Sequence, residues 1–314
     1  MRLARWLTGG FLLFVLFALA WSAAVVPDRT VAELSRRWAA SPSTFRPVAG
    51  LTVHLRDEGP RTDRVPIVLL HGTSASLHTW DGWASALRGT RRVIRADLPG
   101  FGLTGPFPTD DYRIARYAEF VVALLDSLQV PRADLAGHSL GGEVAWEVAA
   151  RTPARVRRLV LVDPAGFPFE STSVPLGFRL ARQPALTWLT SRLLPRGVVE
   201  SSVRDVYGDP ALVTDSLVDR YYDLALREGN RRTLPLRFAH AAPGADTAML
   251  AAVTAPTLIL WGGKDRLIPP STAARFRRLL PAAALIVYPD LGHVPHEEDP
   301  ARTVRDAAAF LGRP

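Results

Sequence analysis

The chain contains no cysteine. This absence excludes disulfide frameworks, zinc–thiolate sites and cysteine nucleophiles. Lysine is nearly absent as well, because Lys264 is the only lysine among 38 lysine and arginine residues, and the net charge is +8. The arginines occur in small scattered groups without interleaved aromatic residues, and the sequence has no nucleic-acid-binding motif. We therefore expect a basic, solvated surface and no nucleic-acid partner.

The composition is that of a folded protein with a large core. Of the 314 residues, 48% are hydrophobic and 22% are charged, which does not indicate disorder. The length fits one large domain, or one domain with an insertion. There is no internal repeat and no low-complexity tract.

One long uncharged run lies near the amino terminus, in residues 6–26, after Arg2 and Arg5. As a helix it would span about 31 Å, enough for the hydrocarbon core of a bilayer. This length favours a retained membrane anchor, although a cleaved signal peptide with its apolar region at 11–19 is an alternative, as is a buried core helix. We therefore predict a membrane or signal segment at 1–27, with the catalytic domain either anchored on the extracytoplasmic side or secreted. Residues 28–49 are expected to be a linker, as a tether or a short amphipathic helix.

The remaining chain alternates between apolar runs and helical patterns. Continuous apolar strands that alternate with helices are typical of an α/β fold with a mostly parallel sheet. Strands are expected at 51–57, 65–72, 91–102, 132–139, 157–166, 255–263 and 283–293, and helices at 112–128, 141–151 and 300–311. Residues 167–243 break this rhythm, because they lack a clear core strand and are rich in helix formers and aromatic residues. We expect a core of residues 50–166 and 244–314 with a helical cap at 167–243.

A single serine stands between glycines in the sequence "GHSLG", residues 137–141. This pattern matches G-x-S-x-G, and it lies between an expected strand and an expected helix, which is the context the motif requires. A strained turn at Ser139 needs small neighbours and lifts the hydroxyl above the strand ends. It also aims the Leu140 N–H at a substrate oxygen, so Ser139 is a candidate nucleophile.

A serine nucleophile needs a base, and His293 is the best placed histidine. It lies in a loop between the last expected strand and the last expected helix, from which it can reach the sheet edge. His296 is the alternative, and the run from His293 to Glu298 also suggests a metal site, but Pro295 spoils a helical ligand arrangement. We expect no metal. The other histidines are expected to be structural, to lack context or to point away from the serine: His54, His71, His78, His138 and His240.

The base needs an acid that fixes its tautomer. Asp265 directly follows an expected strand, and the order Ser139, Asp265, His293 is that of one hydrolase architecture. Asp163 also follows a strand and is the rival, although it also suits a cap of the turn before Pro164. The last requirement is an oxyanion hole, for which the N–H groups of Thr73 and Leu140 are candidates.

Six sequence pieces together resemble the α/β-hydrolase superfamily, in particular its capped esterase and lipase-like members. In chain order they are "LLHGTSAS", "DLPGFGLTG", "GHSLGG", "LVLVDPAG", "WGGKDRLIP" and "LGHVPHEEDP". The resemblance covers residues 50–312 and implies a helical cap inserted after the sixth strand. It also implies Ser139 as nucleophile, Asp265 as acid and His293 as base, the Thr73 and Leu140 amides as the oxyanion hole, and no cofactor.

The expected activity is hydrolysis of a carboxylic ester, thioester or lactone through an acyl-enzyme. The aromatic cap predicts a small apolar substrate. Related dehalogenases and epoxide hydrolases use aspartate where this chain has Ser139. The alternatives are a carbon–carbon bond hydrolase or a cofactor-free perhydrolase on the same triad, and a non-catalytic membrane-tethered binding protein.

Overall fold

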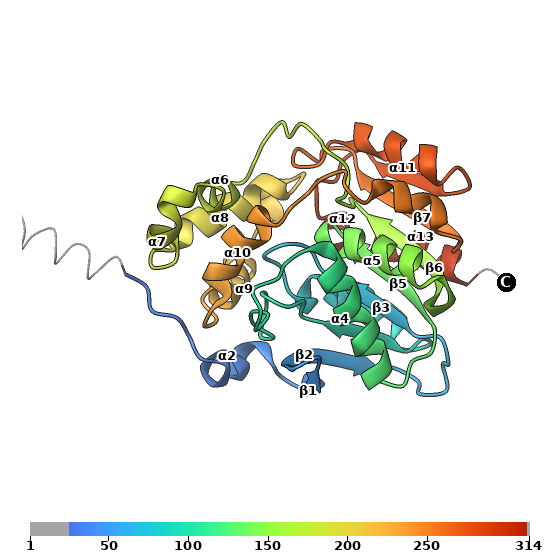
Figure 1. Ribbon diagram of the computed structural model, residues 1–314, viewed down its shortest axis with the longest axis horizontal. Helices are drawn as coiled ribbons and strands as arrows, with labels where there is room; N and C mark the ends of the chain where they lie inside the picture. Colours follow the sequence, from blue (N-terminus) through green and yellow to red (C-terminus); the bar gives the residue numbers. More distant parts are fainter. Residues whose placement is uncertain (1–24, 313–314) are drawn as a thin grey trace, which may run out of the picture.

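The computed structural model describes residues 25–312, which form an eight-stranded sheet flanked by helices, with a further group of helices at one side (Figure 1). The strand order is β1-β2-β4-β3-β5-β6-β7-β8. The first two strands run antiparallel, β2 is antiparallel to β4, and the other neighbours are parallel. The strands are β1 (Thr44–Val48), β2 (Leu51–Glu58), β3 (Ile67–Leu70), β4 (Val93–Ala96), β5 (Ala133–His138), β6 (Val156–Val162), β7 (Thr257–Gly262) and β8 (Ala284–Tyr288).

The parallel strands end together at one edge of the sheet. Leu70 pairs with Ala96 on one side and with Gly137 on the other, and Val162 pairs with His138 and Leu260. Loops that follow β3, β5, β6 and β7 therefore emerge side by side. In open α/β sheets this edge is where ligands bind, so it is the first place to look for a site.

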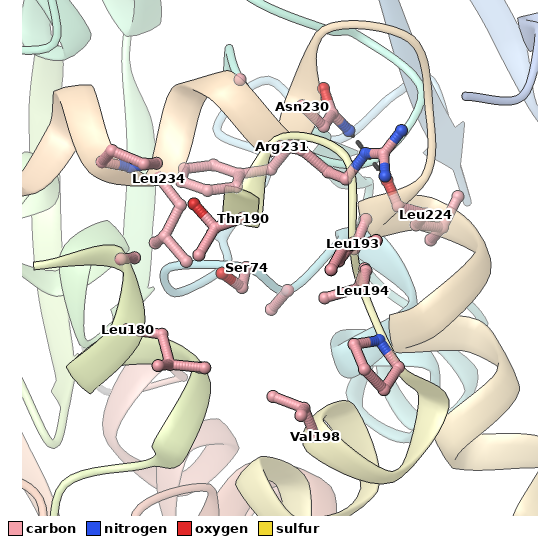
Figure 2. A pocket seen from close by; sticks show the side chains of 18 of the residues that line it. Ser74, Leu180, Thr190, Leu193, Leu194, Val198, Leu224, Asn230, Arg231 and Leu234 are labelled. Carbon is pink, nitrogen blue, oxygen red and sulfur yellow. Dashed lines mark hydrogen bonds between the residues drawn. The ribbon is translucent and has the colours of Figure 1, made fainter. Parts of the chain in front are cut away.

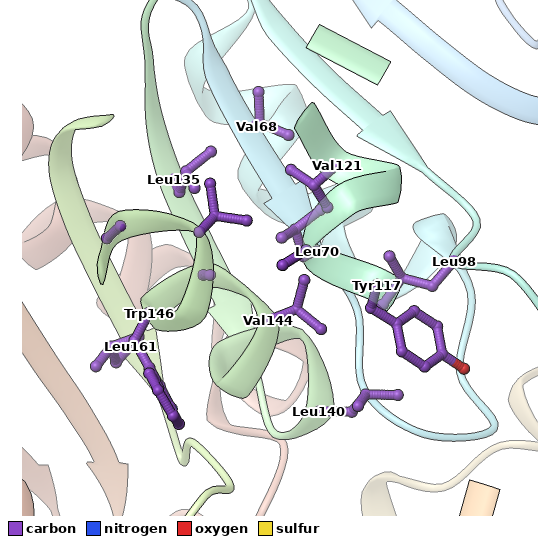
Figure 3. Packing of buried hydrophobic residues seen from close by; sticks show 14 of the residues in the cluster. Val68, Leu70, Leu98, Tyr117, Val121, Leu135, Leu140, Val144, Trp146 and Leu161 are labelled. Carbon is purple, nitrogen blue, oxygen red and sulfur yellow. The ribbon is translucent and has the colours of Figure 1, made fainter. Parts of the chain in front are cut away.

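Helices cover both faces of the sheet. The larger apolar cluster joins one face to α4, α5 and α11, and the smaller cluster joins the other face to α3 and α13. Figure 3 shows Tyr117, Val121 and Val144 packed over Val68 and Leu135 in the larger cluster. These helices are α3 (Asp81–Leu87), α4 (Ile114–Ser127), α5 (Leu140–Arg151), α11 (Ala273–Leu279) and α13 (Pro300–Leu311), with the short α12 (Pro295–Glu298) before the last of them.

The segment between β6 and β7 folds as helices that group beside the sheet (Figure 1). They are α6 (Leu176–Ala181), α7 (Thr187–Thr190), α8 (Arg196–Val206), α9 (Asp215–Ala225) and α10 (Asn230–Ala239). The described part of the chain also forms six short 3₁₀ helices: η1 (Leu77–Trp80), η2 (Pro153–Arg155), η3 (Pro184–Leu186), η4 (Pro210–Leu212), η5 (Thr247–Ala252) and η6 (Pro270–Thr272). We propose the division into a core, residues 50–166 and 244–314, and a cap, residues 167–243, as the domain organisation.

The segment expected to be a linker contains two elements. Helix α2 (Val31–Trp38) begins with a capping box between Thr30 and Glu33. Strand β1 was not expected, and it adds an edge to the sheet by pairing with β2. Four of its five residues are exposed, so it lacks the apolar alternation by which strands are found in sequences.

The predicted membrane segment lies in residues 1–27, almost entirely outside the residues that the structure describes. Among residues 25–312, no helix is both long enough and apolar enough to cross a bilayer. The longest described helix, α4, has 14 residues and spans about 21 Å, whereas the hydrocarbon core is about 30 Å thick. This finding does not support membrane anchoring. The predicted membrane anchor and the predicted exported location are therefore withdrawn.

Candidate active site

Ser139 lies in a strained turn between β5 and α5. Its backbone has φ 52° and ψ −116°, a left-handed conformation that side chains with a Cβ rarely adopt. Two hydrogen bonds hold the turn, from the Ser139 N–H to the Val162 carbonyl and from the Ala165 N–H to the Ser139 carbonyl. The surrounding structure therefore maintains the strain, as it commonly does at functional sites.

The glycines on either side of Ser139 are required by close backbone contacts. A Cβ on Gly137 would lie 2.1 Å from the Gly141 carbonyl oxygen, and a Cβ on Gly141 would lie 2.2 Å from the Leu70 carbonyl oxygen. Neither position can hold a larger residue unless the backbone moves. The turn can therefore lie directly against the end of β3.

His293 and Asp265 meet at the same edge of the sheet. The His293 Nδ1 lies 2.7 Å from Asp265 Oδ2, and both side chains are buried. The other Asp265 oxygen, Oδ1, accepts hydrogen bonds from the N–H groups of Leu267 and Ile268, each at 2.9 Å. The carboxylate is therefore fixed by the loop after β7, and it orients the imidazole so that Nε2 is left for another partner.

Asp163, the rival acid, lies close to the same pair but bonds elsewhere. Its Oδ1 accepts the Gly262 N–H at 2.9 Å, whereas its buried Oδ2 has no partner among the described residues. Burial raises the pKa of Asp163 well above its usual range, and the neighbouring Asp265 carboxylate raises it further. Because two buried like charges repel, the nearby Asp265 carboxyl group favours the protonated form of Asp163.

Sequence reasoning missed two side chains that hold the His293 loop. The ring of His138 donates from Nε2 to the His293 carbonyl at 2.7 Å. Glu298 accepts the Gly292 N–H and the Gly208 N–H, each at 2.8 Å. His138 lies in the "GHSLG" pattern and Glu298 lies in the acidic run after His293. Neither pattern indicates which distant residue the side chain will contact.

The His293 backbone is also held by a contact with α8. The His293 N–H donates to the Val206 carbonyl at the end of α8 at 2.8 Å. The loop that carries His293 is thus bonded both to the sheet, through His138, and to the cap, through Val206.

The two amides expected to form an oxyanion hole flank Ser139. The Leu140 N–H belongs to the first turn of α5, whose N–H groups have no acceptor within the helix. The Thr73 N–H follows β3 and donates to no protein acceptor in the part of the chain that the structure describes. Thr73, Leu140 and Ser139 all line one cavity, so both donors are available there.

Two cavities meet at Ser139, and an outer cavity adjoins one of them. The apolar cavity, about 140 Å³, is lined by Ser139 and His293 together with cap residues that include Val198, Val203 and Leu234. It shares Val198 and Leu234 with an outer cavity of about 120 Å³, which Figure 2 shows framed by Leu180, Leu194, Val198 and Leu234.

The charged cavity, about 100 Å³, lies on another side of Ser139, and its lining includes Glu143, Arg182 and Arg237. Ser139 and Thr73 line both the apolar and the charged cavity. A substrate bound at the serine therefore has room in two directions.

The histidine and glutamate run after His293 does not converge on a metal. His296 lies 3.1 Å from the Thr79 hydroxyl, and Glu297 pairs with Arg220 and accepts from Tyr221. The described residues offer one three-ligand group, in which atoms of Asp163, Asp265 and His293 lie within 4.8 Å of one another. His293 and Asp265 already bond to each other there, so a metal would have to break that hydrogen bond.

A serine, a histidine and an aspartate at the carboxyl edge of a parallel sheet, with a strand–turn–helix at the serine, define a class of hydrolases. A family model described as the alpha/beta hydrolase fold matches residues 65–300. The chain belongs to the α/β-hydrolase family.

The relatives of this chain carry names that describe different enzyme activities. The chain is 33% identical over 249 residues to a dihydrolipoyllysine-residue acetyltransferase component of the acetoin cleaving system of Pseudomonas putida, covering 78% of this chain but only 63% of that protein. It is 30% identical over 275 residues to 2-hydroxymuconate semialdehyde hydrolase of Pseudomonas sp. (strain CF600), covering 84% and 91%. The crystal structure of a membrane phospholipase A superposes with a TM-score of 0.72 at 25% identity and covers 99% of this chain and 98% of that one. The chain is therefore an α/β hydrolase whose relatives do not share one substrate.

Proposed function

We propose that this protein is a serine hydrolase that cleaves a carboxylic ester, thioester or lactone of an apolar substrate. The observation that supports this most strongly is the His293–Asp265 hydrogen bond of 2.7 Å beside a cavity that Ser139 and His293 both line. A nucleophile, a base and an orienting acid are the minimum set for acyl transfer through serine.

In the proposed mechanism, the Ser139 hydroxyl attacks the acyl carbon while His293 Nε2 takes its proton. Asp265 accepts the Nδ1–H hydrogen bond, so it keeps the imidazole in the tautomer with a free Nε2 and stabilises the imidazolium that forms. His293 then returns the proton to the leaving group. In the second half-reaction it activates a water that releases the acid and restores Ser139.

The Thr73 and Leu140 amides are the proposed oxyanion donors. They line the same cavity as Ser139, and the Leu140 N–H also lies at the positive end of the α5 dipole. Charge that develops on the carbonyl oxygen would be held by two fixed donors. Loss of one such donor typically costs about 3 kcal/mol of barrier.

A second candidate is hydrolysis of a carbon–carbon bond on the same triad. It is favoured by the relative named 2-hydroxymuconate semialdehyde hydrolase and by another named 2-hydroxy-6-oxo-2,4-heptadienoate hydrolase, which is 30% identical over 254 residues. Both candidates use Ser139 and His293, so the substrate distinguishes them rather than the triad.

The test is hydrolysis of 4-nitrophenyl esters of increasing acyl length by the full chain, beside Ser139→Ala. We expect turnover that the substitution abolishes, with the best acyl length set by the apolar cavity. A dienoate substrate is assayed in parallel. Ser139-dependent cleavage of the dienoate without ester turnover would replace the esterase proposal with the carbon–carbon alternative.

A further inference from the structure

The charged cavity contains a buried arginine that the proposed chemistry does not use. Arg237 comes from α10, and Glu143 comes from the first turn of α5, four residues after Ser139. Both line the charged cavity together with Ser139 and Leu140, and the exposed Arg182 also lines it. The cavity thus holds two cationic side chains and one carboxyl group beside the nucleophile.

Most nitrogen atoms of the Arg237 guanidinium group lack a hydrogen-bond partner within the described protein. Its side chain is 8% exposed, and its Nη2 donates to Glu143 Oε2 over 3.3 Å. Its Nε and Nη1 have no hydrogen-bond partner among the described residues. A guanidinium carries five N–H donors, and leaving buried donors unpaired is costly, so a ligand acceptor at this position would be strongly favoured.

Glu143 does not neutralise Arg237 throughout the physiological pH range. Burial raises the pKa of Glu143 to about 7, against the influence of Arg237, and Glu147 and Asp246 raise it further. Glu147 is itself bonded to Arg151 at 2.6 Å. Below about pH 7 the carboxyl group is neutral, and the Arg237 charge then has no buried counter-ion.

The cavities on the other side of Ser139 have the opposite character. Among the described residues, no lysine, arginine, aspartate or glutamate lines the apolar cavity, whose polar side chains are those of Ser139, His138, His293 and a few other hydroxyl residues. In the outer cavity the one charged side chain is Arg231, which already pairs with Asp28. Of the two cavities that Ser139 lines, only the charged cavity therefore has charged side chains in its lining, set among apolar residues such as Phe167 and Phe238.

We propose that Arg237 forms an anion subsite, and that the substrate is a two-armed ester with one apolar arm and one arm that carries a carboxylate or phosphate group. The apolar arm lies in the apolar and outer cavities, and the anionic group bonds to Arg237 in the charged cavity. Arginine suits this task because its planar fork matches carboxylate and phosphate oxygens. This inference rests on the proposed function and names the substrate class for the same site.

The test compares matched esters that differ only in the anionic group. One pair is 4-(hexanoyloxy)benzoate and the corresponding neutral benzamide. 4-(Hexanoyloxy)phenyl phosphate is assayed beside them to test a phosphate group in place of the carboxylate. The other pair reverses the orientation, with the 4-nitrophenyl monoester of adipic acid against 4-nitrophenyl hexanoate. We expect kcat/KM to favour an anionic ester by about 10- to 100-fold in one orientation, as hydrogen bonds to charged groups typically provide.

Substitution of Arg237 should remove this preference selectively. In Arg237→Met the ratio of kcat/KM for the anionic ester to kcat/KM for the neutral ester should fall to about one, and Arg237→Lys should restore part of the preference. Arg232→Gln is the matched control, because it removes one exposed positive charge from the same helix outside the charged cavity. A preference that survives Arg237→Met, or no preference in either orientation, overturns the proposal.

Two further measurements separate binding from folding and from the proposed function. Arg237→Met leaves Glu143 buried without its partner, so the double variant Arg237→Met/Glu143→Gln, which removes both charges, is assayed as well and should also lack the preference. In the wild type, the ratio of kcat/KM for the anionic ester to kcat/KM for the neutral ester should rise as the pH falls through about 7. Glu143→Gln should abolish that rise. A ratio that does not depend on pH in the wild type contradicts the proposal. Neutral-ester turnover that requires Ser139 tests the proposed function alone, so the two proposals fail separately.

Discussion

At the scale of single residues, two neighbouring aspartates differ in their surroundings and hence in their roles. Asp265 accepts hydrogen bonds from two backbone N–H groups and from the His293 ring, so both of its oxygens have donors. Asp163 is buried with one oxygen unpaired, and the pKa of its carboxyl is raised. Their positions in the sequence are alike, since each follows a strand directly, so only the contacts distinguish them.

This difference predicts unequal effects of the same substitution at the two sites. Asp265→Asn should lower kcat by about 10⁴-fold, because an amide holds the wrong imidazole tautomer. Asp163→Asn should lower it by less than about tenfold, because an amide can still accept the Gly262 N–H and donate toward Asp265. Steady-state kinetics on one 4-nitrophenyl ester measure both. An equal loss in the two variants would contradict the assignment of Asp265 as the orienting acid.

Glu143 gives a residue-scale prediction for stability. In the folded chain its pKa is about 7, whereas the ordinary value is 4.5, so the folded state holds a proton that the unfolded state has lost between these two pH values. Stability therefore falls as the pH rises through this window, by on the order of 3 kcal/mol from this group. Urea unfolding at pH 5 and pH 8 should show a smaller fall in Glu143→Gln than in the wild type. Equal falls in the two proteins would be inconsistent with a buried, titrating Glu143.

At the scale of elements, the amino-terminal segment fastens the cap. Asp223 on α9 accepts hydrogen bonds from Arg29 at 2.6 Å, from Arg37 at 3.3 Å and from the Trp38 indole at 3.0 Å. The Arg29 backbone also exchanges hydrogen bonds with the loop after α9. Asp223 is buried and accepts hydrogen bonds from three side chains of the amino-terminal segment, and Arg37 also pairs with Asp219 on the same helix at 3.1 Å.

We therefore expect Asp223→Ala to destabilise the protein by about 1–3 kcal/mol, because it leaves three donors without an acceptor. The half-exposed arginines will recover some of this loss by binding water. Trypsin should also cleave faster after Arg36 and Arg37. Asp215→Ala is the control on the same helix, since Asp215 is 89% exposed and its loss should cost under about 0.5 kcal/mol. If the two variants behave alike, α2 does not fasten the cap.

The elements that the sequence predicted are those with strong local patterns. The buried strands β3 and β7 appear as apolar runs, and α4 shows buried residues at helical spacing, as in Tyr117, Val121 and Leu124. Strand β1 has neither pattern, because four of its residues face solvent and its pairing with β2 supplies the structure. Local periodicity therefore fails at the edge of the sheet, where the partner strand decides.

At the scale of the whole molecule, the site is assembled from residues far apart in sequence. Order along the chain and position after a strand were enough to select Ser139, Asp265 and His293 as candidates, and the sheet brings them to one edge. The bonds from Val206 and His138 to His293 and the burial of Arg237 beside Glu143 could not be predicted. They join elements more than 80 residues apart, and no local motif specifies such contacts.

The most direct test of the account is whether Ser139 is an activated nucleophile. The full chain is treated with a fluorophosphonate, and the modified peptide is identified by mass spectrometry, beside His293→Ala and Ser139→Ala. We predict stoichiometric modification at Ser139 in the wild type, a rate lower by at least about 10³-fold in His293→Ala, and none at this position in Ser139→Ala. A folded wild type that is not modified at Ser139, or that is modified equally fast without His293, would contradict the account.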